Sequence, residues 1–113
     1  MKLNHLNLTV TDVSAARGFL EKYFGLTCRA SRGNGFAVLF DDDGFVFTLM
    51  KGNDVQYPKT FHIGFAQENK ESVDQINQRL KEDGFDVKPP QQLHGYTFYV
   101  EAPGGFTVEV LSQ

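Results

Sequence analysis

Three residues with metal-binding side chains stand far apart in the chain: His5, His62 and Glu109. Each lies in a short segment in which bulky apolar residues alternate with polar or small ones. Side chains of a strand alternate between two faces, so each of the three points away from the bulky apolar residues of its own segment. Two neutral imidazoles and a carboxylate are a common ligand set for first-row divalent metals and leave positions open for substrate. The pattern predicts one divalent ion (Mn, Fe, Ni, Co or Zn) bound by these three residues.

Each residue also has an ordinary structural interpretation. A single histidine in a strand is commonly a hydrogen-bonded residue of the core, and Glu109 could be a charge on an edge strand. However, a buried carboxylate without a partner costs free energy, and a bound cation would offset that cost. The metal interpretation is favoured because the three residues stand at matching positions of an internal repeat.

The elements that position these residues are predicted twice, in the same order. Alternating apolar residues, with Gly- and Asp-rich turns between them, indicate the strands. The short oxygen-bearing side chains of Thr11 and Asp12 indicate the start of the first helix, helical spacing indicates both helices, and a glycine stops each. The first set comprises strands at 3–10, 27–31, 35–40 and 45–50 and a helix from Val13 to Phe24; the second comprises strands at 60–66, 85–88, 96–100 and 106–111 and a helix at 71–82.

The repeat also holds residue by residue. Val13, Ala16 and Leu20 correspond to Val73, Ile76 and Leu80 at a constant shift of 60 residues. Residues 44–50 align with 105–111, so Thr48 stands where Glu109 stands in the second copy. We predict a single α+β domain over 1–113, built from two βαβββ repeats (1–50 and 60–113) joined by a linker at 51–59. The repeats are expected to form a curved, barrel-like sheet with the helices outside.

Composition narrows the classes of partner. The chain has 113 residues, a net charge of −3, eleven Phe and one Cys. Scattered basic residues argue against a nucleic-acid partner, and no apolar stretch approaches the roughly 20 residues of a membrane span. A lone Cys28 fits a reducing, cytoplasmic location and is expected to be a small buried side chain.

Three motifs together resemble one protein family. They are Asn4-His5-Leu6-Asn7-Leu8-Thr9-Val10 with Phe24-Gly25-Leu26, Phe61-His62-Ile63-Gly64-Phe65, and Pro103-Gly104-Gly105-Phe106-Thr107-Val108-Glu109. They resemble the vicinal oxygen chelate superfamily, which includes glyoxalase I, extradiol dioxygenases, fosfomycin-resistance thiol transferases and bleomycin-binding proteins. The resemblance implies that paired βαβββ units curl into a cup, a concave sheet surface that holds the metal. It also implies a homodimer in which each cup can combine halves of two chains.

Departures from the family pattern distinguish its branches. Thr48 occupies the position of the fourth ligand of glyoxalase I, and a neutral hydroxyl is a poor substitute. The three-ligand pattern is similar to that of the fosfomycin thiol transferases, which place polar substrate contacts where Thr97 and Tyr99 stand. Fosfomycin itself is disfavoured, because Pro89-Pro90 replaces a lysine-containing stretch and the sequence stops at Gln113, before the family's C-terminal basic residue.

The remaining site residues are assigned from their strand faces. Tyr99 could donate a hydrogen bond to an oxyanion or act as an acid, so Tyr99 and Glu109 are the predicted catalytic residues. An ordinary aromatic residue of a strand would explain Tyr99 equally well. Asn7, Thr9, Thr48 and Thr97 are the predicted substrate contacts, although a half-polar strand face would explain them too. His94 is interpreted as a solvent-exposed turn residue.

Two functions follow from this pattern. The first is a metal-dependent enzyme that stabilises an oxyanion or enolate of a small oxygen-rich substrate, as a lyase, thiol transferase or dioxygenase. The alternative is a sequestration protein of the bleomycin-resistance type, whose Phe-rich cup holds a ligand without chemistry.

Overall fold

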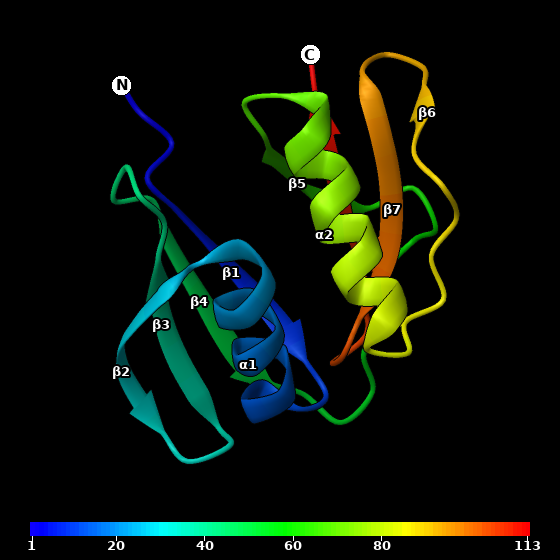
Figure 1. The fold of residues 1–113 in the computed structure, drawn as a ribbon. Helices are drawn as coiled ribbons and strands as arrows, with labels where there is room; N and C mark the ends of the chain where they lie inside the picture. Colours follow the sequence, from blue (N-terminus) through cyan, green and yellow to red (C-terminus); the bar gives the residue numbers. More distant parts are fainter. The chain divides into compact units, whose positions relative to one another are not determined.

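A computed structural model describes all residues from Met1 to Gln113. The chain forms two compact units, one comprising residues 1–57 and 103–105 and the other residues 58–102 and 106–113. Each unit has its own sheet and helix (Figure 1), and buried apolar residues form a core in each. Neither helix has the length and apolar character needed to span a bilayer.

The same βαβββ order occurs in both units. The first unit contains β1 (His5–Val10), α1 (Val13–Phe24), β2 (Thr27–Arg32), β3 (Phe36–Phe40) and β4 (Val46–Lys51), with sheet order β1-β4-β3-β2. The second contains β5 (His62–Ala66), α2 (Lys70–Glu82), β6 (Gln91–Gln92), β7 (Tyr96–Ala102) and β8 (Phe106–Ser112), with sheet order β5-β8-β7-β6. The predicted α+β class and the repeat are therefore confirmed, with each repeat forming its own four-stranded sheet, curved but not closed.

Asp12 caps α1 as the sequence predicts, and a second side-chain cap precedes α2. The carboxylate of Asp12 accepts a hydrogen bond from the backbone N–H of Ala15 at 3.0 Å, and the side chain of Asn69 caps α2 in the same way. Gly25 ends α1 at a φ of 68°, in the left-handed region that glycine adopts without a steric penalty.

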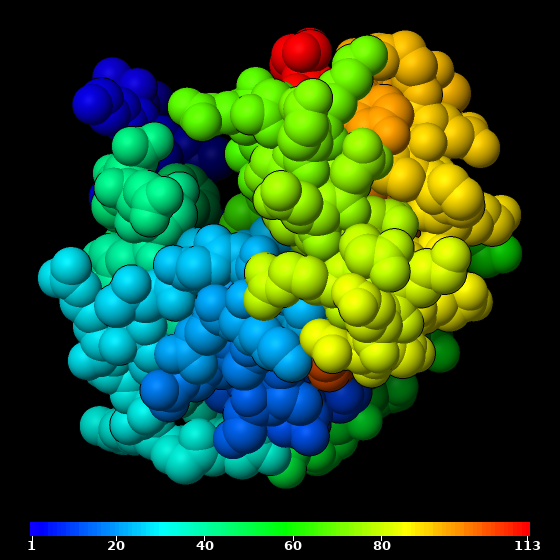
Figure 2. All heavy atoms as spheres, in the orientation of Figure 1, coloured from blue at the N-terminus to red at the C-terminus, as the bar shows by residue number.

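One face of each helix is buried against its own sheet. The buried apolar residues recur at helical spacing, Val13, Ala16 and Leu20 in α1 and Val73, Ile76 and Leu80 in α2. The outer side of α2 lies open to solvent (Figure 2, green to yellow). Because the apolar side of each sheet is occupied by a helix, the polar side is free to carry a site.

The strand predicted at residues 85–88 is wrong. Pro89 and Pro90 have no backbone N–H to donate, so ladder pairing with β7 is limited to Gln91 and Gln92. The segment is held to α2 instead, since the side-chain amide of Asn77 donates to the carbonyl of Lys88 at 2.9 Å. The other predicted boundaries agree to within two residues; β1, for example, begins at His5 rather than Leu3.

Strand register extends the repeat to the level of single residues. Val38 pairs with Thr48 across β3 and β4, and Tyr99 pairs with Glu109 across β7 and β8. On its other side Thr48 pairs with Asn7, as Glu109 pairs with Gly64. Thr48 thus occupies in the first unit the position that Glu109 occupies in the second.

Candidate metal centre

Glu109 is the buried carboxylate of the second unit. It lies on β8 between Val108 and Val110, which are fully buried, and its own side chain turns to the opposite, polar face of the sheet. Only 5% of the residue is exposed. A charged group this well covered requires partners, and Glu109 has them at both oxygens.

The two oxygens of Glu109 have different neighbours. Oε2 accepts hydrogen bonds from the hydroxyl of Thr97 at 2.6 Å and from Nε2 of His94 at 2.5 Å. Oε1 lies 3.2 Å from Nε2 of His62. Three residues of β5, β7 and the turn before β7 therefore converge on one carboxylate of β8.

The orientation of the His62 ring determines what Nε2 can do. Its Nδ1 lies 2.9 Å from the backbone carbonyl of Thr60, and a carbonyl only accepts, so Nδ1 carries the hydrogen. In the neutral ring Nε2 then presents a lone pair to Oε1 of Glu109, another acceptor. Two acceptors face each other in this arrangement, and a cation or a proton between them is needed to make the contact favourable.

The spacing of that pair suits a shared metal ion. Ligand bonds of about 2.1 Å, set about 90 to 110° apart, place two donor atoms about 3.0 to 3.4 Å from each other. The distance of 3.2 Å between Nε2 of His62 and Oε1 of Glu109 lies inside this range.

Glu109 is ionised at neutral pH. Burial raises the pKa of its carboxyl, but hydrogen bonds from Thr97, His94 and Tyr99 outweigh burial, and the net pKa lies below the ordinary value. The negative charge that a metal requires is therefore present before any ion binds.

Tyr99 stands beside this carboxylate as a neutral phenol. Burial, then the charge of Glu109 and a hydrogen bond to it, raise the pKa of the phenol above its usual value of 10. Its ring also packs edge-on against His62, with centroids 5.4 Å apart. A phenol that stays protonated can donate a hydrogen bond to an oxygen atom in front of Glu109.

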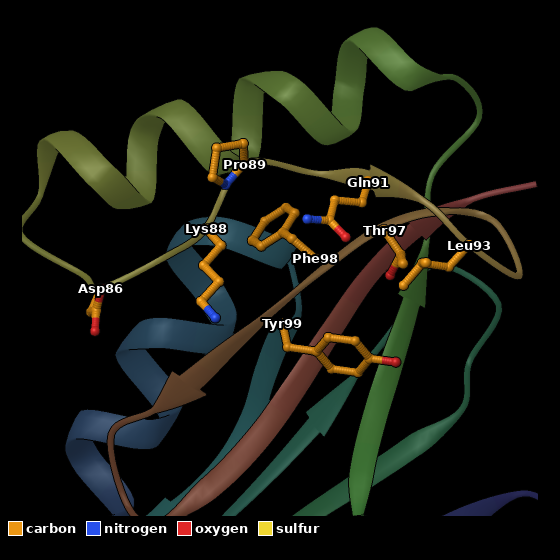
Figure 3. Close-up of a pocket in the computed structure, with 8 residues that line it drawn as sticks. All are labelled: Asp86, Lys88, Pro89, Gln91, Leu93, Thr97, Phe98 and Tyr99. Atoms are coloured by element: carbon orange, nitrogen blue, oxygen red, sulfur yellow. The ribbon is translucent and has the colours of Figure 1, made fainter.

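Two cavities reach this group of residues. One, of about 410 Å³, lies where the 86–91 segment separates from β7 (Figure 3); its lining residues are Asp86, Lys88, Pro89, Gln91, Leu93, Thr97, Phe98 and Tyr99. The other, of about 450 Å³, is lined by Lys59, Thr60, His62, Tyr99, Glu101 and Thr107. Tyr99 lines both cavities.

The first unit carries the third predicted ligand, His5. Its Nδ1 lies 2.7 Å from the side-chain oxygen of Asn4, which leaves Nε2 with the free lone pair, as in His62. Asn7 and Thr48 are hydrogen-bonded to each other at 2.7 Å, and the backbone of Thr9 is bonded to the hydroxyl of Tyr57. Within either unit, no three His, Cys, Asp or Glu side chains are grouped closely enough to hold a metal ion. Of the three predicted ligands, His5 belongs to the first unit, whereas His62 and Glu109 belong to the second.

His94 is the site residue that sequence reasoning missed. Its side chain is 53% exposed, as expected of a turn residue, yet its Nε2 touches the buried carboxylate. Strand alternation places only residues within a strand, and His94 lies two residues before β7 begins. The only signal available was its closeness in sequence to Thr97.

Comparisons with known proteins support the fold and the family. The sequence model described as Glyoxalase/Bleomycin resistance protein/Dioxygenase superfamily matches residues 2–110. A solved structure described as a possible glyoxalase from Bacillus cereus is 71% identical over 98% of both chains, with a TM-score of 0.95. No curated protein sequence matches the chain.

Two more distant structures share the fold. The fosfomycin resistance protein FosX from Listeria monocytogenes, solved with Mn(II) and 1S,2S-dihydroxypropylphosphonic acid, is 24% identical over 97% of this chain and 90% of its own, with a TM-score of 0.82. Lactoylglutathione lyase from Agrobacterium tumefaciens is 20% identical over 98% of this chain and 92% of its own, with a TM-score of 0.78.

Proposed function

Since the chain belongs to the glyoxalase, bleomycin resistance protein and dioxygenase superfamily, we propose that it is a metal-dependent enzyme whose divalent ion is held by His5, His62 and Glu109. One observation carries the proposal: in the neutral ring of His62, Nδ1 donates to Thr60, so Nε2 and Oε1 of Glu109 are two acceptors that face each other at 3.2 Å. His5 supports it, because its Nδ1 is also engaged and its Nε2 is free.

The ligand set suits Mn, Fe, Ni, Co or Zn, and Mn(II) is the ion bound to the related fold of FosX. A bound ion would supply Lewis acidity, polarising an oxygen of the substrate. The protein's own contribution is to bind and orient that substrate. Tyr99 would donate a hydrogen bond to the oxygen on which charge develops, and Thr97, Asn7, Thr9 and Thr48 would contact other polar groups.

The substrate is proposed to be a small oxygen-rich molecule, and the reaction to be of the lyase, thiol-transferase or dioxygenase type. These three reactions share a negatively charged oxygen that a cation stabilises. The homodimer that the family resemblance implies, with cups built from halves of two chains, is part of the same proposal.

Metal content tests the proposal. Untagged wild-type protein, Glu109→Ala and the control Glu82→Ala, an exposed glutamate of α2, are incubated with each metal, desalted and analysed by mass spectrometry. We expect close to one ion per site in wild type and in the control, and a loss of most metal in Glu109→Ala. Equal, negligible metal in all three proteins contradicts a metalloenzyme.

The cavity beside β7 favours a second candidate, a ligand-binding protein. Its walls include Phe98, Pro89 and Leu93, and its volume of about 410 Å³ suits a small organic ligand. This function predicts that Glu109→Ala binds the ligand as tightly as wild type does, whereas the metalloenzyme predicts weaker binding.

A further inference from the structure

We propose that His94 is a positioning residue of the metal centre: with Thr97 it holds Oε2 of Glu109, so that the carboxylate offers Oε1 alone to the metal. The inference rests on the proposed function, because it assigns a role toward the same ion. It names a residue outside the three ligands and specifies how one of them coordinates.

The two carboxylate oxygens of Glu109 differ in their hydrogen-bond partners. Oε2 accepts from Thr97 at 2.6 Å and from His94 at 2.5 Å, whereas Oε1 is the oxygen directed at Nε2 of His62. A carboxylate oxygen with two close donors has little remaining capacity to coordinate a cation. Oε1, which faces the free lone pair of His62, is therefore the oxygen that is available as a metal ligand.

The two donors to Oε2, Thr97 and His94, differ in the number of acceptors within their reach. The hydroxyl of Thr97 has one hydrogen and two acceptors within reach, Oε2 of Glu109 at 2.6 Å and the carbonyl of Val110 at 3.1 Å. When that hydrogen turns toward Val110, Thr97 no longer stabilises the carboxylate. The Nε2–H of His94 has Glu109 as its acceptor, so His94 is the more constant of the two donors.

A closed turn places His94 beside Glu109. The backbone N–H of Leu93 donates to the carbonyl of Gly95 at 2.8 Å, which closes the turn on both sides of His94. Gly95 is buried against β8, where an added Cβ would lie 3.0 Å from the carbonyl oxygen of Ser112. The turn is thus fixed against β8, the strand that carries Glu109.

Core packing does not account for this placement, because about half of the His94 side chain is exposed. The polar contact that the imidazole makes is with Glu109. Hydrogen-bonding partners of metal ligands orient those ligands, and their removal typically lowers metal affinity about 10- to 100-fold. We assign His94 the same kind of effect.

Calorimetric titration of Mn(II) into metal-free protein tests the role of His94. We expect His94→Ala to bind Mn(II) about 10- to 100-fold more weakly than wild type, and His94→Gln, which keeps an N–H donor, to recover part of the loss. Gln92→Ala, at an exposed residue of β6 two positions before His94, is the control and should match wild type. His94→Ala binding as tightly as wild type, or more tightly, overturns the inference.

A second measurement separates positioning from a general loss of structure. In the Co(II) form of His94→Ala, release of Oε2 lets both oxygens coordinate, so the visible d–d bands weaken as the coordination number rises. Bands identical to those of wild type overturn the inference. If wild-type protein binds none of the five metals, both the proposed function and the role of His94 are overturned. If Glu109→Ala loses the metal but His94→Ala binds it with full affinity, only the role of His94 is overturned.

Discussion

Tyr99 and Glu109 stand directly opposite each other on β7 and β8, and the equivalent pair in the first unit is Val38 and Thr48. The two repeats thus have the same backbone register but different chemistry at the same place. One pair combines a phenol with a carboxylate, and the other combines an apolar side chain with a hydroxyl. The carboxylate belongs to one copy of the repeat only.

This relationship predicts the effect of Thr48→Glu. The substitution restores in the first unit the carboxylate that the second unit has, two residues along β4 from Val46, the partner of His5. We expect Mn(II) affinity to rise by about tenfold or more, because a fourth, charged ligand joins the site. Met50→Glu, on the same strand face and two residues farther from His5, is the control. Equal affinities for the two variants contradict the role of Thr48 as the vacant ligand position.

Metal binding should also stabilise the fold. A ligand present at about 100 times its Kd adds about 2.7 kcal/mol to the free energy of unfolding if it binds only the native state. For a chain of this size, that corresponds to a rise in Tm of about 10 °C. We expect this rise for wild type in Mn(II), measured by differential scanning calorimetry. His62→Ala and Glu109→Ala should show little of it, and a similar rise in both variants would point to binding elsewhere.

Much of the site follows from the two-residue period of a strand. Because β7 and β8 are regular, alternation alone places Thr97, Tyr99 and Glu109 on one face, opposite the apolar residues that pack on α2. His94 could not be placed in this way, since it lies in a turn whose course depends on contacts with β8. The strand predicted at 85–88 is wrong for a related reason. Apolar and polar residues do alternate there, but the two prolines that follow cannot donate to a ladder, and pairing with β7 is limited to Gln91 and Gln92.

Gly104 provides a test of backbone packing in the first unit. Its φ is 100°, and an added Cβ would lie 3.0 Å from Cβ of Val10 and 3.3 Å from Cβ of Ala16. Gly104→Ala should lower the free energy of unfolding by about 2 to 4 kcal/mol, from backbone strain and overpacking together. Gly105 has a φ of 95° and no atom within 4 Å of an added Cβ. Gly105→Ala should therefore lower the free energy of unfolding by about 1 to 2 kcal/mol, from backbone strain alone. Urea denaturation measures both, and equal losses would argue against the steric contact.

Tyr96 links β7 to α2 and should make stability depend on alkaline pH. Its hydroxyl donates to Asp74 at 2.6 Å, and this hydrogen bond, with smaller effects from burial and from the charge of Asp74, raises the pKa of the phenol above 10. A group whose pKa is raised by folding contributes stability that is fully present below its unfolded pKa and lost as pH rises through the folded pKa. The loss should therefore begin near pH 10 and continue above it. Absorbance titration at 295 nm of wild type, Tyr96→Phe and Asp74→Asn follows the phenol ionisation that causes this loss. Because the pKa of Tyr99 is raised as well, Tyr96→Phe identifies which late titration belongs to Tyr96, and Asp74→Asn should lower the midpoint of that titration. An unchanged midpoint in Asp74→Asn would show that Asp74 does not set the pKa of Tyr96.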